Sequence, residues 1–273
     1  MVCHESYKDQ NGQWLYPEEV EKLDTKTVIK KLDKSKVKVG PPESMSKSKK
    51  NTIDPETMIK QYGADSVRWF ILSDSPPEKD IQWSNTGVAS ANKFLQKIWN
   101  LNKLIIEREE KIINEDEEKE FKIQINNYLY KIDGAINNFR FNVAIAHFYE
   151  AYRFFKDNLG KKVSNKMIKQ SIIQLMKQMI PFVPHLAHEC LVLMGCKEID
   201  KWPKINKNQF NSIKLAVQIN GKTRDIMTVQ SDLNEKEINK KVLKDSKANK
   251  YIKDRQIKKT IFIKNKIINY IIS

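Results

Sequence analysis

The stretch that decides the fold is SNTGVASANKFLQKIWNLNKLII, residues 84–106. Its apolar side chains recur every three or four residues, which is the spacing that lines one face of an α-helix. They are Val88, Ala91, Leu95, Ile98, Leu101 and Ile105. The segment therefore predicts a long amphipathic helix with one buried face.

Further helical patterns follow on its C-terminal side. One covers residues 144–159, and the next covers residues 172–194, where Pro181 and Pro184 interrupt or kink the helix because proline lacks the backbone donor. The charged run 107–120 is polar on all sides, so we expect a solvated helix end or a loop there. Several amphipathic helices without strands between them predict a helical bundle.

The N-terminal part combines irregular chain with short helices. Residues 1–50 are rich in turn formers and carry too little apolar surface to fold alone, as is typical of a piece of a larger domain. After them, Asp54 can cap a helix that starts at Pro55, and Gly63 can end it. A second helix is expected to begin near Asp65.

The apolar period changes near the C-terminus. Beyond a polar linker at residues 206–211, Leu215, Val217 and Ile219 alternate with other residues as in a β-strand. The Asn220-Gly221 pair that follows is the strongest short signal for a β-hairpin. The period predicts that the chain ends in a unit that contains a sheet.

The remaining tail pattern is mixed. We expect a return strand over 222–229, a charged helix over 232–250, and strands over 257–263 and 267–272. The whole chain is thus predicted to be mainly α with a small α+β end. Its expected domains are residues 1–80, residues 81–205 and residues 212–273.

Charge is concentrated in this tail. The chain has a net charge of +15, and residues 201–273 hold 18 Lys or Arg against 6 Asp or Glu, which is +12. A basic tail on a nearly neutral body predicts contact with nucleic acid phosphates, and the alternative is a solvated basic surface. Three cysteines without a C-x-x-C pair indicate a reducing compartment, and no apolar run reaches the roughly 18 residues that span a membrane. We therefore expect a cytoplasmic protein with no membrane partner.

The strongest local motif is Ser-Met-Ser-Lys-Ser-Lys-Lys-Asn, residues 44–51. It predicts a flexible, cationic, hydroxyl-rich loop. Lysine can pair with phosphate oxygens as a point charge, and such a loop suits a triphosphate because negative charge builds up on the leaving pyrophosphate. The alternative is an ordinary solvated loop.

This motif resembles the Lys-Met-Ser-Lys-Ser signature of class I aminoacyl-tRNA synthetases, with Ser44 in place of the first lysine. Residues 51–55 and 62–68 continue the resemblance to the enzymes specific for leucine, isoleucine, valine or methionine. Residues 1–8 and the hairpin 217–224 resemble the bacterial-type leucyl-tRNA synthetase family in particular. The likeness runs through nearly the whole chain and corresponds to the C-terminal portion of that family.

The resemblance implies site residues and partners. Met45, Ser46, Lys47 and Ser48 would bind ATP, which is a substrate accompanied by Mg²⁺, and Lys47 would stabilise the transition state of leucine activation. The partners would be tRNA(Leu), with leucine and ATP bound largely by other parts of the enzyme. Residues 1–80 would be the end of a class I catalytic domain with the stem-contact helices, and residues 81–205 the helical anticodon-binding domain. Losing the first signature lysine would lower the charge of the loop, which Lys49 and Lys50 are expected to offset.

The hairpin carries the predicted tRNA contacts Lys214, Lys222 and Arg224. Lys222 and Arg224 are two residues apart, so strand alternation predicts that they share a face. With Lys214 they would form a basic surface that holds phosphates without reading sequence. The alternative is a charged sheet edge that prevents aggregation.

No protein-bound metal is predicted. His185, His188 and Cys190 lie close together in the sequence, but no fourth ligand is evident, and structural zinc sites usually have four.

Other synthetase elements have no counterpart in the sequence. It has no His-Ile-Gly-His-like element, no phosphate-cradling glycine cluster and nothing that resembles the editing domain. We expect either a fragment of a longer enzyme or a natural subunit completed by an N-terminal synthetase subunit, and in both cases a chain that is inactive alone. Two alternatives stay open: the equivalent part of an isoleucyl, valyl or methionyl enzyme, and a non-catalytic tRNA-binding module.

Overall fold

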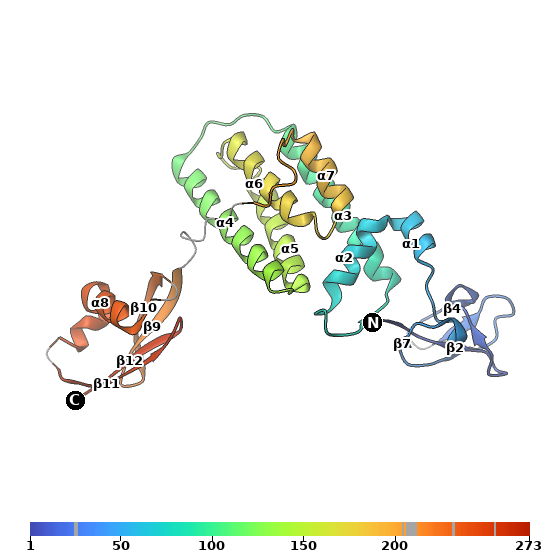
Figure 1. The fold of residues 1–273 in the computed structure, drawn as a ribbon, viewed down its shortest axis with the longest axis horizontal. Coiled ribbons are helices and arrows are strands. Elements are labelled where there is room, and N and C mark those ends of the chain that lie inside the picture. The colour runs from blue at the N-terminus through green and yellow to red at the C-terminus, as the bar shows by residue number, and fades with distance from the viewer. Residues whose placement is uncertain (25–26, 204, 206–211, 231–232, 254) are drawn as a thin grey trace. The chain divides into compact units, whose positions relative to one another are not determined.

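The computed structural model describes residues 1–24, 27–203, 205, 212–230, 233–253 and 255–273. The chain divides into two compact units, residues 1–204 and 205–273 (Figure 1). The predicted mainly α architecture is confirmed, and the predicted linker at residues 206–211 lies outside the described residues. The division into three domains stays a prediction.

The N-terminal part of the first unit is built from short strands. Its first sheet has the order β7-β1-β8, and its second has the order β3-β2-β6. A small core of Tyr7, Leu15, Val20, Val28 and Val37 holds this part together. The bounds of these elements are β1 Val2–His4, β2 Tyr7–Lys8, β3 Trp14–Leu15, η1 Pro17–Glu19, β4 Val20–Lys22, β5 Val28–Lys30, β6 Lys38–Val39, β7 Glu43–Ser44, η2 Lys47–Lys49 and β8 Ile81–Gln82.

Two short helices lead from these strands to the bundle. Helix α1 spans Pro55–Tyr62, and the Asp54 carboxylate accepts hydrogen bonds from the backbone N–H groups of Glu56 and Thr57, as predicted for its cap. Gly63 ends α1 with a φ of 83°, a backbone angle that glycine adopts without steric cost, and it also precedes α2, Ala64–Asp74.

The helical bundle contains α3 Asn85–Ile106, α4 Glu115–Asn137, α5 Phe141–Asn158, α6 Asn165–Met179 and α7 Pro184–Leu193, which Figure 1 shows gathered into one body. The predicted apolar face of α3 is buried in it. Trp69 of α2 is fully buried, and its ring packs against Phe94, Phe148, Tyr149 and Phe182. Aromatic packing therefore joins α2 to the bundle core.

The charged run 107–120 is a loop followed by the solvated N-terminal end of helix α4, as expected. Residues 107–114 lie between α3 and α4, but α4 begins at Glu115, and its first turn is acidic from Glu115 to Glu118. Acidic side chains stabilise a helix N-terminus through its dipole, so this charged run starts a helix. Phe121, Ile125 and Leu129 then form its buried stripe.

The second unit is a four-stranded sheet with the order β10-β9-β12-β11. Its elements are β9 Ser212–Ile219, β10 Lys222–Gln230, α8 Glu235–Asp245, η4 Lys247–Tyr251, β11 Ile257–Ile263 and β12 Ile267–Ile272. Asn220 and Gly221 have φ angles of 48° and 79°, which confirms the hairpin turn. The predicted charged helix is shorter than 232–250 and ends in the 3-10 turn η4.

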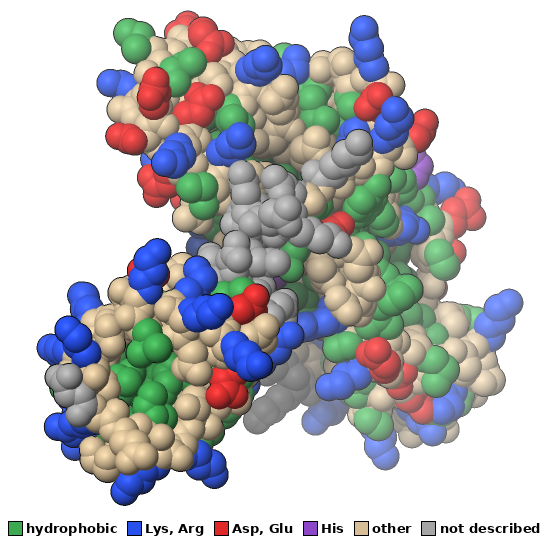
Figure 2. Space-filling model, turned by 60° about the vertical axis from the view of Figure 1, so that its left-hand side comes forward, with side chains coloured by type: hydrophobic (Ala, Val, Ile, Leu, Met, Phe, Trp, Pro, Cys, Tyr) green, Lys and Arg blue, Asp and Glu red, His purple; other side chains and the backbone are tan. Residues whose placement is uncertain are grey.

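One face of this sheet packs on α8 and η4. Leu215, Val217 and Ile219 are buried against Ile238 and Val242 of α8. Figure 2 shows hydrophobic side chains of this unit within a frame of Lys and Arg. Strand alternation in β9 places Lys214, which precedes the buried Leu215, on the face of the sheet away from this core.

Candidate nucleotide and RNA contact sites

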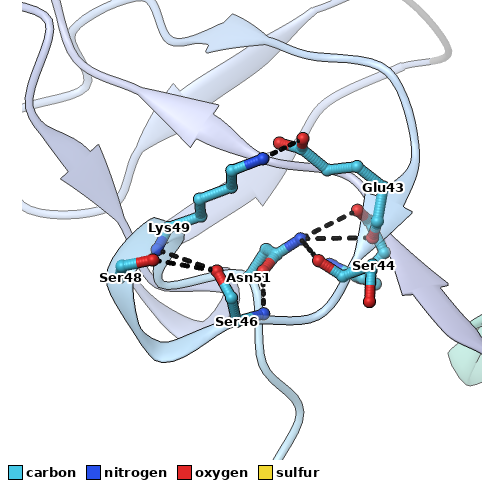
Figure 3. A network of polar contacts seen from close by, with 7 residues as sticks. Glu43, Ser44, Ser46, Ser48, Lys49 and Asn51 are labelled. Carbon is cyan, nitrogen blue, oxygen red and sulfur yellow. Dashed lines mark hydrogen bonds and ion pairs between the residues drawn. The ribbon is translucent and has the colours of Figure 1, made fainter.

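The signature loop is a short turn of helix supported by the strands at its base. Ser46 precedes η2, and its hydroxyl accepts a hydrogen bond from the backbone N–H of Lys49 (3.3 Å) and contacts the hydroxyl of Ser48 (3.1 Å; Figure 3). Lys50 ends the turn in the left-handed region with a φ of 51°. Before the loop, Ser44 lies in β7 opposite Cys3 of β1.

Asn51 fastens the loop to these strands. Its side chain is fully buried, and its Oδ1 accepts a hydrogen bond from the backbone N–H of Ser46 at 2.8 Å. Its Nδ2 donates toward the carbonyl oxygens of His4 (3.2 Å), Glu43 (3.4 Å) and Ser44 (3.4 Å; Figure 3). One amide thus joins both ends of the loop to β1.

The three lysines of the loop have different surroundings. Lys49 forms an ion pair with Glu43, and this hydrogen bond lowers the pKa of the Glu43 carboxyl. The ammonium of Lys50 lies 5.0 Å from the ring centroid of Tyr16. Lys47 is exposed, and its side-chain ammonium has no hydrogen-bond or ion-pair partner in the described part of the chain. Lys47 is therefore the loop lysine whose charge is available to a bound anion.

These surroundings decide whether Lys49 and Lys50 can offset the positive charge that is lost where Ser44 replaces the first signature lysine. Glu43 neutralises Lys49, and the Tyr16 ring faces Lys50, so neither lysine simply replaces the charge of the first signature lysine. Met45 and Ser46 are half-buried, whereas Ser48 is exposed beside Lys47. Lys47 and Ser48 are therefore the most exposed residues of the predicted set.

In the second predicted site, on the hairpin, Lys222 and Arg224 share one face of the sheet but Lys214 does not. Lys222 pairs with Ile219, whose side chain faces the core, and Arg224 is the extra residue of a bulge between Thr223 and Asp225. The Arg224 guanidinium lies 4.7 Å from the ring centroid of Tyr251 in η4. The bulge, not simple alternation, therefore directs Arg224 to the side of the sheet that η4 covers.

Lys214 does not join these two residues. It pairs with Thr228, far from the turn, and it neighbours the buried Leu215 in the strand, so it lies on the opposite face of the sheet. The prediction of one basic surface from Lys214, Lys222 and Arg224 is wrong in this respect. A contact of Lys214 with tRNA remains a separate prediction.

Of the group His185, His188 and Cys190, His185 contacts Asp65 of the neighbouring helix α2. The Asp65 carboxylate contacts Nδ1 of His185 (2.9 Å) and accepts a hydrogen bond from the backbone N–H of Leu186 (2.7 Å). Burial raises the pKa of the Cys190 thiol to about 12. Within the described ranges, no group of three or more His, Cys, Asp or Glu side chains is placed to hold a metal ion. No helix in the same ranges is long and apolar enough to cross a membrane.

Sequence reasoning missed two sets of residues that position these sites. Asn51 was part of the quoted motif, but its contact with His4, 47 residues away, has no signal in local spacing. The partners of Asp65 and Arg68 likewise lie over 110 residues away in the sequence, so local spacing gives no signal for these contacts. Arg68 donates to the carbonyl oxygens of Pro181 (2.6 Å) and Phe182 (3.1 Å).

Comparison with known families gives the class of protein. Residues 37–84 match the family of class I tRNA synthetases for isoleucine, leucine, methionine and valine. Residues 118–240 match the anticodon-binding domain of tRNA ligase. Two separate stretches of the chain are therefore similar to tRNA synthetases, and the first of them is similar to those of class I.

Relatives that match the chain along its whole length include leucine–tRNA ligases. Over its whole length the chain is 36% identical to the leucine–tRNA ligase of Wolbachia pipientis subsp. Culex pipiens and 37% identical to that of Orientia tsutsugamushi. It spans 33% of the length of each, corresponding to their C-terminal third. A crystal structure of the Agrobacterium radiobacter K84 agnB2 LeuRS-tRNA-LeuAMS ternary complex superposes on 84% of this chain and 31% of that chain, with a TM-score of 0.64 and 28% identity.

Proposed function

We propose that this chain supplies the signature loop and tRNA-binding parts of a leucine–tRNA ligase, which joins leucine to tRNA(Leu) with ATP. The similarity to leucine–tRNA ligases along the whole chain carries the proposal. The exposed, unpaired Lys47 within a fastened signature loop supports it physically. The activity belongs to a ligase about three times as long as this chain, and we place it in the cytoplasm.

In this mechanism the chain acts on the phosphates. Leucine attacks the α-phosphate of ATP, the bond between the α- and β-phosphates breaks, and negative charge develops on the departing pyrophosphate. The Lys47 ammonium stabilises that charge, with Ser48 as a neighbouring hydrogen-bond donor. Mg²⁺ bound together with ATP would supply further positive charge at the phosphates. Asn51 holds the loop in place before ATP binds, so less ordering is needed during the reaction.

A chimaera tests the proposal. The matching third of the Orientia tsutsugamushi ligase would be replaced by this chain, and leucine-dependent pyrophosphate exchange and leucylation of tRNA(Leu) would be measured. We expect both activities, and we expect none from the purified chain alone. A chimaera that is folded but charges tRNA for isoleucine, valine or methionine instead would refute leucine specificity.

Lys47→Ala in this chimaera separates a catalytic from a purely tRNA-binding role. We expect a loss of about 100- to 1,000-fold in pyrophosphate exchange, because a preorganised donor to the developing charge is removed. The affinity for tRNA should stay unchanged. Lys38→Ala is a matched control, since Lys38 is an exposed lysine in β6 outside the loop. Unchanged exchange together with weaker tRNA binding would instead support the non-catalytic binding module.

A further inference from the structure

The four-stranded sheet of the tail unit has a second face, opposite the one that packs on α8 and η4. Because alternate residues of β9 and β12 are buried in the core, the residues between them face the other way. Ile226 of β10 pairs with Ala216 of β9, which also pairs with Ile267 of β12. Ile267 in turn pairs with Ile263 of β11. One row of apolar side chains therefore crosses all four strands.

The two ends of this row are exposed. Ile226 is 61% exposed and Ile263 is 50% exposed, and Ile261 on the same side of β11 is 41% exposed. An exposed apolar patch with a polar rim marks a surface that binds a partner protein or a membrane. We use the name isoleucine face for the outward aliphatic residues of the sheet, which are Ala216, Ile226, Ile261, Ile263, Ile267 and Ile271.

Lysines lie around the isoleucine face. Lys214 is an outward residue of β9, Lys259 is an outward residue of β11, and Lys266 ends the turn between β11 and β12. All three residues are exposed. An anionic partner that covers the isoleucine face would therefore meet positive charge at the edges of the contact.

Negative charge does not balance these lysines within the described strands. The single carboxylate of the four strands is Asp225 in β10. It is turned to the core side, where it accepts hydrogen bonds from the Ser246 hydroxyl (2.7 Å) and from the backbone N–H of Lys247 (2.8 Å). The isoleucine face and the lysines around it thus combine apolar and positive character, without an acidic side chain from the described strands.

The residue types of this surface favour an anionic lipid surface over a protein or RNA partner. Protein interfaces are enriched in aromatic residues and arginine and depleted in lysine, and single-stranded RNA is held by aromatic side chains on which its bases stack. The outward strand residues described here include no aromatic residue and no arginine, since Arg224 is turned toward η4. Aliphatic side chains surrounded by basic ones are instead the combination that enters the boundary between headgroups and acyl chains and attracts anionic lipids.

We propose that the isoleucine face of the tail unit binds the surface of an anionic lipid bilayer. The isoleucine side chains enter the headgroup boundary, and the lysines around them pair with the lipid phosphates. Such a contact is peripheral, so it needs no spanning helix, and the lack of a spanning segment was the basis for expecting no membrane partner. The proposal is independent of the ligase function, because the hairpin cations Lys222 and Arg224 lie on the other face of the sheet.

Sedimentation of the purified 273-residue chain with lipid vesicles tests the proposal. One set of vesicles contains equal parts of phosphatidylcholine and phosphatidylglycerol, and the other contains phosphatidylcholine alone. We expect binding to the anionic vesicles to be at least about tenfold stronger, because each lysine near an anionic surface adds to the attraction. Raising the salt from about 0.1 M to about 1 M should weaken this binding, since the Debye length falls from about 10 Å to about 3 Å.

Two pairs of substitutions separate the apolar from the charged contribution. Ile226→Gln with Ile263→Gln keeps the net charge, and we expect at least about tenfold weaker binding to the anionic vesicles, because two aliphatic side chains no longer leave water. Lys259→Gln with Lys266→Gln should weaken the same binding by about tenfold. All four residues are exposed, and circular dichroism would verify that each variant is folded.

Each pair has a matched control. Leu104→Gln with Ile112→Gln alters two aliphatic side chains of the first unit that are 54% and 87% exposed, and vesicle binding should change less than about twofold. Lys222→Gln with Arg224→Gln removes the same charge from the other face of the sheet and should have a smaller effect than the lysine pair of the isoleucine face. Equal losses from the two charge pairs would overturn the proposal and leave only a general attraction between a basic protein and anionic lipid.

Binding of fluorescently labelled tRNA(Leu), followed by anisotropy, decides between lipid and RNA. We expect Ile226→Gln with Ile263→Gln to lose vesicle binding and to keep its affinity for tRNA(Leu). If the same variant keeps vesicle binding and loses affinity for tRNA(Leu), the isoleucine face contacts RNA and the lipid proposal fails. If the unaltered chain stays in the supernatant with both sets of vesicles, the proposal also fails, and a protein partner is then left for this face.

Discussion

At the scale of single residues, Asn51 does most to shape the signature loop. Its amide satisfies one backbone N–H and three carbonyl oxygens, and it is fully buried. A buried hydrogen-bonding group that loses its partner costs about 1–3 kcal/mol. The position of Lys47 therefore depends on a side chain that never contacts the ligand.

We predict that Asn51→Asp loosens the loop more than Asn51→Ala. An aspartate cannot donate to the carbonyl oxygens of His4, Glu43 and Ser44, and its second oxygen would face them. Hydrogen–deuterium exchange of residues 44–51 in the purified chain should rise by roughly tenfold or more, as a loss of 1–3 kcal/mol implies. Exchange in the tail unit is the internal control. Unchanged exchange in Asn51→Asp would show that the strands alone hold the loop.

The sequence allowed part of this site to be predicted. The order of Met45, Ser46, Lys47 and Ser48 suffices for the motif, and the exposed Lys47 agrees with its proposed role. The ion pair between Glu43 and Lys49 could not be predicted from the sequence, because several lysines in the motif could have paired with Glu43. Which lysine pairs with it depends on the position of β7 beside β1.

At the scale of elements, α2 is fastened to the turn between α6 and α7. Helix ends leave unsatisfied N–H groups and carbonyl oxygens. Asp65 accepts at the N-terminus of α7, and Arg68 donates to the carbonyl oxygens of Pro181 and Phe182. Residues 62–68 and the turn at Pro181–His185 are therefore linked by hydrogen bonds, although over 110 residues separate them in the sequence.

We predict that Asp65→Ala lowers the free energy of unfolding of the first unit by about 1–3 kcal/mol, because it removes the carboxylate that caps α7 and leaves the part-buried N–H of Leu186 without its acceptor. Urea unfolding followed by circular dichroism would measure this. Glu120→Ala is the control, since Glu120 is an exposed carboxylate on α4. Asp65→Ala with Arg68→Ala should lose less than the sum of the single losses, since both act on one turn. Strict additivity would mean that the two contacts are independent.

Sequence patterns predicted some of the helices and strands better than others. Helix α3 and both proline interruptions were evident, because spacing and proline chemistry are local. Helix α4 was obscured by its own acidic first turn, although Phe121, Ile125 and Leu129 show the helical spacing. The bulge at Arg224 depends on pairing with β9, so strand alternation alone could not predict it.

At the scale of the whole molecule, basic residues occur in both compact units. The tail carries the concentrated charge that the sequence indicated, whereas the first unit is nearly neutral overall. Net charge thus located one candidate RNA surface, which would contribute to the salt dependence of RNA binding.

The structure of the tail predicts which of its cations act together. Lys222 and Arg224 lie near the hairpin turn, and Arg224 is held over Tyr251, whereas Lys214 is on the opposite sheet face. A rigid RNA helix that meets the hairpin on the η4 side cannot reach Lys214 at the same time. We therefore expect Lys222→Glu with Arg224→Glu to weaken tRNA binding by about tenfold and to lower the salt slope by about 2.

Lys214→Glu is the matched comparison, and we expect it to change affinity by less than twofold when both variants are titrated with fluorescently labelled tRNA(Leu) and followed by anisotropy. Tyr251→Leu should give an intermediate loss, because Arg224 then loses the aromatic ring that restrains it. If Lys214→Glu lowers the affinity as strongly as the hairpin pair, RNA contacts both faces of the sheet. In that case the hairpin is not a separate site, and the RNA must wrap around the edge strand β10.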